Sequence, residues 1–195
     1  MDIVKLNKAF SLFDEYNRRD PNIFKTDGHA EPSTYFFALK LYGWVTTLNP
    51  NASEALLLAS RSQHIGRWEV PRSTYPEGRV GYLKWRSDLS RLHAQKAADI
   101  LGAVGYDSDT IDHVQDIILK RKLKTDTEVQ TIEDALCLVF LEFQYDDLIA
   151  KHSDEKIVRI LRKTWGKMTD QGKKVALTLN FTEKGTLLLD KALEG

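Results

Sequence analysis

The chain has a single cysteine among its 195 residues, so no disulfide can form within it. That residue, Cys137, lies in the apolar run Ala-Leu-Cys-Leu-Val-Phe-Leu, where no neighbouring group in the sequence would lower its pKa. A buried structural thiol is therefore predicted rather than a catalytic nucleophile.

Long hydrophobic runs and an excess of charge are also missing. No stretch of about 18 consecutive apolar residues is present, so no membrane span is predicted. The first residues lack the basic and apolar regions of a secretory signal, which favours a cytoplasmic protein. Because 28 Lys and Arg balance 28 Asp and Glu, a general nucleic-acid surface is not indicated, although a local basic patch is compatible with a neutral total.

The usual short catalytic motifs are absent as well. The sequence contains no glycine-rich phosphate loop, no Cys-x-x-Cys pair and no Gly-x-Ser-x-Gly nucleophile motif. Any site must therefore be assembled from residues that are distant in the sequence.

Most long segments instead carry apolar residues at spacings of three and four, which is typical of amphipathic helices. This periodicity predicts seven helices, over residues 3–17, 32–48, 53–68, 81–104, 108–123, 128–150 and 155–167. Residues 175–181 fit either a short strand or a helical turn. The expected architecture is a single all-α domain over residues 1–195, a helical bundle with a less regular C-terminal appendage over residues 172–195.

Two histidines and one aspartate stand out on these helices. His64 shares a face with Arg61 and Trp68, and His93 shares a face with Arg86. Asp134 lies in a segment that is apolar nearly all round, so we expect it to be buried.

A buried carboxylate needs a cation, a metal ion or several hydrogen-bond donors. Asp134 could therefore pair with a core arginine or cap a neighbouring helix, and either histidine alone could be an ordinary core or surface residue. Taken together, imidazoles and a carboxylate on separate helices indicate a divalent metal site held by His64, His93 and Asp134.

A series of cations surrounds the loop over residues 69–80, and long loops are often functional. The series is Arg61, Arg67, Arg72, Arg79 and Arg86, interleaved with Trp68, Tyr75, Tyr82 and Trp85, with Lys84 and Lys120 as further candidates. These arginines could be an ordinary solvated surface. Since guanidinium groups bind phosphate and carboxylate oxygens in a bidentate manner, the series also indicates an anion-binding site.

Several motifs resemble those of the domain of unknown function 4202 family along most of the chain. They are Glu31-Pro32, Ala59-x-x-x-Gln63-His64-Ile65-x-Arg67-Trp68, Pro71-Arg72, Tyr75-Pro76, Tyr82-x-x-Trp85-Arg86, His93 and Glu133-Asp134-Ala135-x-x-Leu138-Val139-Phe140-Leu141-Glu142. The resemblance implies an architecture and no particular activity.

The layout is more distantly similar to the HD superfamily of helical metal-dependent phosphohydrolases. That resemblance implies an HD-like bundle, in which Glu31 lies near the first metal ligand, Gln63-His64 replaces the His-Asp pair, His93 is an intermediate histidine, Lys120 replaces another histidine and Asp134 is the last aspartate. The standard ligand set is therefore altered at its first member and at the central pair.

These observations predict a metal-dependent hydrolase that acts on a small phosphorylated or otherwise anionic substrate. The expected metal ligands are Glu31, His64, His93 and Asp134; the expected substrate-binding residues are Arg61, Gln63, Arg67, Trp68, Arg72, Arg79, Lys84, Arg86 and Lys120. Glu69 or Glu133 would orient the attacking water or carry its proton.

Two alternatives use the same scaffold. One is a binding module without catalysis, which would dock a nucleotide, an RNA end or an acidic partner. The other is a metal oxygenase, because imidazole and carboxylate ligands also suit iron.

Overall fold

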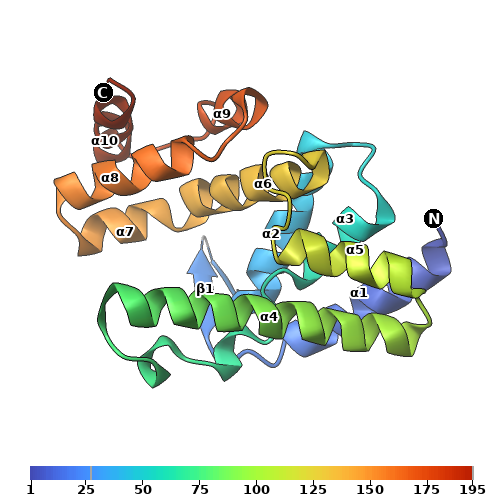
Figure 1. Cartoon of the computed structure of the whole chain (residues 1–195). Helices are drawn as coiled ribbons and strands as arrows, with labels where there is room; N and C mark the ends of the chain where they lie inside the picture. Colours follow the sequence, from blue (N-terminus) through green and yellow to red (C-terminus); the bar gives the residue numbers. More distant parts are fainter. Residues whose placement is uncertain (27, 195) are drawn as a thin grey trace.

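The fold is taken from a computed structural model of the chain, in which residues 1–26 and 28–194 are described. These residues form ten α-helices, one β-hairpin and two short 3₁₀ turns (Figure 1). The elements are α1 (Ile3–Asn17), β1 (Ile23–Thr26), β2 (His29–Pro32), α2 (Ser33–Leu48), α3 (Glu54–Ser62), η1 (Arg67–Glu69), η2 (Arg72–Thr74), α4 (Gly78–Val104), α5 (Ser108–Ile118), α6 (Thr127–Phe143), α7 (Tyr145–Lys151), α8 (Asp154–Trp165), α9 (Asp170–Ala176) and α10 (Glu183–Leu193). The predicted all-α class is confirmed, with more helices than the seven expected.

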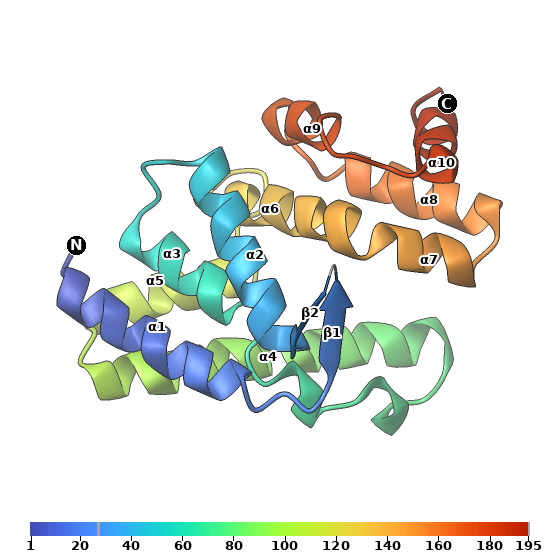
Figure 2. The same ribbon diagram turned by 180° about the vertical axis from the view of Figure 1, so that it is seen from behind.

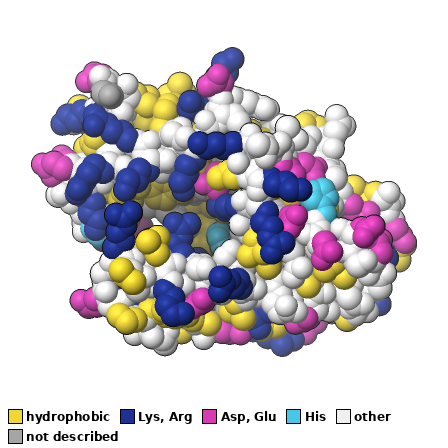
Figure 3. All heavy atoms as spheres, in the orientation of Figure 1, with side chains coloured by type: hydrophobic (Ala, Val, Ile, Leu, Met, Phe, Trp, Pro, Cys, Tyr) yellow, Lys and Arg dark blue, Asp and Glu magenta, His cyan; other side chains and the backbone are white. Residues whose placement is uncertain are grey.

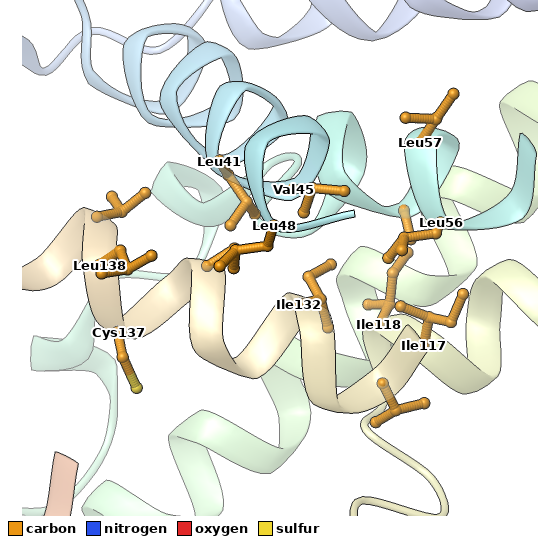
Figure 4. Close-up of a cluster of buried hydrophobic side chains, with 14 of the residues drawn as sticks. Leu41, Val45, Leu48, Leu56, Leu57, Ile117, Ile118, Ile132, Cys137 and Leu138 are labelled. Atoms are coloured by element: carbon orange, nitrogen blue, oxygen red, sulfur yellow. The ribbon is translucent and has the colours of Figure 1, made fainter. Parts of the chain in front are cut away.

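The centre of the core lies between α2, α3, α5 and α6 (Figure 4). Val45 of α2, Leu56 of α3 and Ile132 of α6 have no measurable solvent exposure. Fully burying a side chain of this size contributes about 1.5–3 kcal/mol. The segment that contains Asp134 is therefore fixed in the middle of the protein, as its apolar pattern predicted.

The hairpin is an element that the sequence did not predict. Its strands are antiparallel, with Phe24 opposite Glu31. The Phe24 ring packs on Phe36 and Phe37 of α2, with ring centroids 4.6 and 4.8 Å apart. Two strands of four residues are too short to show a clear alternation in the sequence, and contact with α2 stabilises them.

Two predicted helices differ from the structure at their C-terminal parts. The predicted helix over residues 53–68 ends at Ser62, and the one over residues 128–150 is interrupted at Gln144, where φ is −125°. In the ambiguous tail, α10 forms because the Thr182 hydroxyl accepts a hydrogen bond from Gly185 N at 3.1 Å, which caps the helix. The last helix packs against α8, which lies beside it in both views (Figures 1 and 2).

The buried thiol is confirmed. Cys137 is 6 % exposed, and burial raises the pKa of its thiol to about 12. In the described part of the chain, every helix is too short or too polar to cross a bilayer.

Candidate functional site

Two adjacent cavities lie between α4 and the centre of the protein, and together we call them the cleft. We call the first, of about 410 Å³, the cationic cavity; it is lined by Gln63, His64, Arg67, Leu83, Arg86, Ser87, Leu89, Ser90, Arg91, His93, Ile118, Leu119 and Lys120. We call the second, of about 870 Å³, the apolar cavity; its lining includes Phe37, Leu41, Trp68, Val70, Pro71, Tyr82, Trp85, Leu136, Val139 and Phe140. His64, Arg67 and Arg86 line both cavities, so a ligand can contact the two together.

The turn that follows α3 places the first group of site residues. Gly66 has a φ of +70°, a left-handed conformation that is unfavourable for other residues. Arg67 N donates to His64 O at 3.1 Å, which closes this turn. The turn therefore brings Gln63, His64 and Arg67 to one edge of the cleft.

The opposite wall comes from α4 and the end of α5. Arg86, Ser90 and His93 are spaced by four and three residues, so they share one face of α4. Lys120 lies two residues after the end of α5, and its φ is +55°. Lys122 and Lys124 also have positive φ values, so this conformation belongs to the whole turn that follows α5.

The two histidines meet in the cleft, as the sequence predicted. Their ring centroids are 5.7 Å apart with an angle of 75° between the planes. His93 Nδ1 lies 2.7 Å from Ile65 O, and because a carbonyl only accepts, Nδ1 carries the proton. The lone pair of His93 is therefore on Nε2.

Both imidazoles are neutral at neutral pH. Burial lowers the pKa of His93 to about 4, against the opposing effect of its bond to Ile65 O. Burial, followed by the positive charge of Arg67, also lowers the pKa of His64 well below its ordinary value. His64 therefore offers a lone pair that can accept a proton.

Positive charge dominates the cationic cavity. Four cations line it, namely Arg67, Arg86, Arg91 and Lys120, and its described lining includes no carboxylate. Figure 3 shows a hollow on this face, with Lys and Arg side chains around it and hydrophobic and histidine atoms inside it. A cavity of this kind attracts anions.

Glu133 contacts one of these cations, Lys120, and holds it in position. Its buried carboxylate forms ion pairs with Lys120 and with Lys167, the latter at 3.2 Å. Burial alone would raise the pKa of Glu133, but the two lysines hold that pKa below its ordinary value. Glu133 therefore remains charged and positions Lys120 instead of facing the cleft.

Gln63 contributes an unused acceptor. Its Nε2 donates to Ile118 O at 3.1 Å, but its buried Oε1 has no hydrogen-bond partner among the described residues. Gln63 is only 5 % exposed, and buried polar atoms without a partner are rare in native proteins. A ligand or water that donates a hydrogen bond would satisfy this oxygen.

Some predicted anion-binding residues lie elsewhere. Arg61 is buried on α3, where it pairs with Asp14 and lies 5.0 and 5.4 Å from the ring centroids of Phe10 and Tyr42. Its helix face is in the core, so its guanidinium pairs with Asp14 and lines neither cavity, while Arg61 Nε and Asp14 Oδ1 have no hydrogen-bond partner among the described residues. The sequence showed the spacing of Arg61 and His64 but not that the helix ends between them.

Three more of the predicted cations also lie outside the cationic cavity. Arg72 donates to Tyr75 O and Pro76 O at 2.8 and 2.9 Å, which orders its own loop. Lys84 is exposed and pairs with Asp88 at 3.0 Å. Arg79 is exposed near the start of α4 and lines neither cavity.

The predicted catalytic carboxylate Glu69 is also engaged. It accepts a hydrogen bond from the Tyr16 hydroxyl and pairs with Lys96 at 2.9 Å. Burial opposes this charge, but Tyr16 and Lys96 hold the pKa of Glu69 below its ordinary value. Glu69 lines neither cavity of the cleft.

The predicted metal ligands do not converge. Asp134 accepts hydrogen bonds from Thr169 N at 3.0 Å, from the Thr169 hydroxyl and from Gln130 Nε2 at 3.1 Å. It holds the start of α9 against α6, which was the capping alternative for this residue. Glu31 lies in β2 and lines neither cavity.

No group of three His, Cys, Asp or Glu side chains that could hold a metal ion is found among the described residues. The four-residue ligand set predicted from the sequence therefore does not fit this arrangement. The physical reason is that Asp134 of α6 bonds to Thr169 and lines a different cavity from the one that His64 and His93 line.

Other site residues were missed at the sequence level. Ser87, Ser90 and Arg91 line the cationic cavity, and Phe37 and Phe140 line the apolar one. Ser90 could have been found, since it lies between Arg86 and His93 at helical spacing. Phe37 and Phe140 belong to helices whose apolar residues are indistinguishable from core residues in the sequence.

One known family matches the chain across all the residues that line the cleft. The family model described as domain of unknown function (DUF4202) matches residues 7–189. The chain belongs to the DUF4202 family. No curated protein and no solved structure gives a significant match. The DUF4202 match includes every residue of both cavities and ends within α10.

Proposed function

We propose that this DUF4202 protein binds the phosphate group of a small substrate in the cationic cavity and hydrolyses it. The observation that carries the proposal is the combination of four cations and two neutral imidazoles in a cavity whose described lining has no carboxylate. One arginine side chain can bind two oxygens of a phosphate group, and fixed positive groups stabilise the negative charge that develops in the transition state. The sequence resemblance to the HD superfamily also predicted a phosphohydrolase, although one that works through a metal ion.

His64 is the proposed proton acceptor. A water oxygen forms a bond to phosphorus while the bond from phosphorus to the ester oxygen breaks. His64 takes a proton from the water and returns it to the departing alkoxide, so the products are an alcohol and inorganic phosphate. Gln63 Oε1 is a second acceptor that can orient the same water, because both residues line the cationic cavity.

A divalent metal ion was the predicted cofactor, but its four expected ligands are not brought together among the described residues. The proposed steps are therefore assigned to the side chains of the protein itself. The oxygenase alternative depends on the same ligands, and no observation favours it.

Phosphate binding and phosphate release test the proposal. Arg86→Gln should weaken binding of inorganic phosphate by about tenfold to a hundredfold, the equivalent of one or two charged hydrogen bonds. Arg79→Gln is the matched control, because Arg79 lies on the same helix but outside the cleft. Equal affinities in the two variants would overturn the assignment of the site.

Turnover is measured as phosphate released from a panel of phosphomonoesters, once with EDTA and once with added Mg²⁺ or Mn²⁺. His64→Gln should bind phosphate but lose about 10²- to 10⁴-fold in rate, because general base catalysis has this magnitude. An unchanged rate in His64→Gln would contradict the proposed role of His64.

One observation favours binding without catalysis as a second candidate. Both carboxylates that were expected to carry protons, Glu69 and Glu133, are engaged in ion pairs with lysines. A nucleotide, an RNA end or an acidic partner would then occupy the cleft without reaction. Salt-sensitive binding of a labelled oligonucleotide, with no phosphate release from any ester, would support this candidate over the hydrolase.

A further inference from the structure

The larger of the two cavities has no role in the reaction proposed above. Its 870 Å³ is about twice the volume of the cationic cavity. Aromatic and aliphatic residues form one part of its wall, and Asp20, Asn22, Ser33, Thr34 and Gln144 form a polar part. Five aromatic side chains contribute to it: Phe37, Trp68, Tyr82, Trp85 and Phe140. The aromatic and aliphatic part of the wall gains little from contact with a phosphate ion, a sugar or another strongly hydrated group.

The two cavities are adjacent and share charged residues in their walls. Arg67 and Arg86 belong to both linings, and so does His64. The Arg67 guanidinium lies 5.1 Å from the Trp85 ring, and that of Arg86 lies 5.8 Å from the Tyr82 ring. The arginines therefore mark the boundary between the charged end and the apolar end of the cleft.

Several walls of the apolar cavity are held in place before any ligand binds. Trp85 Nε1 donates to Val70 O at 2.9 Å, which fixes the loop on α4, and Trp68 packs against Tyr16 with ring centroids 5.7 Å apart. The Phe37 ring is 5.3 Å from Phe36. A preformed apolar pocket beside a few charged groups is the usual form of a small-molecule site.

We propose that the substrate is a phosphate monoester whose alcohol part is an apolar body, either aromatic or aliphatic, that fills the apolar cavity while its phosphate lies among the cations. This inference rests on the proposed function, since it takes the cationic cavity as the phosphate site. It adds that phosphate esters of small hydrophilic alcohols, such as glycerol, are poor ligands. Burial of the apolar body supplies the difference in affinity.

The test uses phosphonates, which the enzyme does not hydrolyse, and measures their affinities by calorimetry. The series is methylphosphonate, 2-hydroxyethylphosphonate, hexylphosphonate and 1-naphthylmethylphosphonate. At least one of the last two should bind about tenfold tighter than methylphosphonate or better, and the hydroxyethyl compound should gain nothing. The hexyl and naphthylmethyl compounds distinguish an aliphatic from an aromatic body.

Variants then show which residues provide the added affinity for the apolar ligands. In Tyr82→Ala and in Phe37→Leu, the ratio of the apolar ligand's affinity to that of methylphosphonate should fall toward one. Val80→Ala is the control, because Val80 is 84 % exposed on the same helix as Tyr82 and lines neither cavity. The melting temperature of each variant verifies that it is folded.

The outcomes separate this inference from the proposed function. If methylphosphonate binds and neither apolar body adds affinity, the inference is overturned while the phosphate site stands. It is overturned in the same way if the added affinity is identical in Tyr82→Ala, Phe37→Leu and Val80→Ala. If neither inorganic phosphate nor any phosphonate binds, the proposed function itself fails.

Discussion

Replacing Asp134 by asparagine distinguishes a structural aspartate from a metal ligand. The side chain is buried and accepts three hydrogen bonds, two of them from Thr169. Asparagine keeps the size of the side chain but presents an NH₂ group to one of these donors. We therefore expect Asp134→Asn to destabilise the protein while leaving phosphate binding in the cleft unchanged.

The expected loss of stability can be calculated from the hydrogen bonds that Asp134→Asn weakens or removes. A hydrogen bond to a charged group contributes about 1.5–3 kcal/mol, and asparagine retains one of the two acceptor oxygens. A loss of about 3 kcal/mol is expected, which corresponds to a decrease in melting temperature of about 6–12 °C for a chain of this size.

Thermal unfolding followed by calorimetry measures this effect. The matched control is Asp170→Asn, because the Asp170 side chain is 94 % exposed and forms a surface ion pair with Lys173 at 3.5 Å. The control should melt within about 2 °C of the original protein. The reasoning is refuted if Asp134→Asn melts like the control and instead loses a bound metal ion.

Three further predictions follow from buried ionisable groups. Glu133→Gln should lower the free energy of unfolding by about 1–2 kcal/mol, since Lys120 and Lys167 are partly solvated. It should also tighten phosphate binding a few-fold, because it removes a charge that opposes the phosphate. A hundredfold slower turnover with unchanged affinity would instead make Glu133 a catalytic group. Because the pKa of His93 is about 4 in the folded protein and higher in the unfolded protein, the unfolded state binds more protons below neutrality. His93 should therefore lower the free energy of unfolding by about 3 kcal/mol as the pH falls from about 6.5 to 4. The loss of stability measured by denaturation over this range should be smaller by this amount in His93→Gln, where His64, whose pKa is also lowered, still contributes. Cys137 should react with a thiol reagent only after unfolding, and rapid labelling of the native protein would contradict its burial.

The helices were the most predictable part of the fold. Periodic apolar residues located seven segments, and the burial of Asp134 and Cys137 followed from the run around them. The ends of α3 and α6 were not predictable, because the amphipathic pattern continues past Ser62 and past Phe143 while tertiary contacts bend the chain. Boundaries of this kind depend on packing more than on local preference.

The candidate site was predictable in part for the same reason. His64, Arg67, Arg86, His93 and Lys120 do meet in one cavity, as do Gln63 and Trp68 in the cleft. The direction in which a buried polar side chain points was not readable from the sequence, and this is why Asp134 and Arg61 were assigned to the site. Each satisfies its charge inside the core, with Thr169 and Asp14 respectively.

The most direct test of the account is a titration of the protein with inorganic phosphate, followed through the ¹⁵N signals of the histidine imidazoles. In the free protein His64 should be neutral at pH 6.5, since burial and the positive charge of Arg67 hold its pKa well below that value. Bound phosphate should move the His64 signals and raise its pKa, because a nearby anion favours the protonated ring. The account is contradicted if saturating phosphate leaves the signals of His64 and His93 unchanged, or if the response is the same in Arg86→Gln.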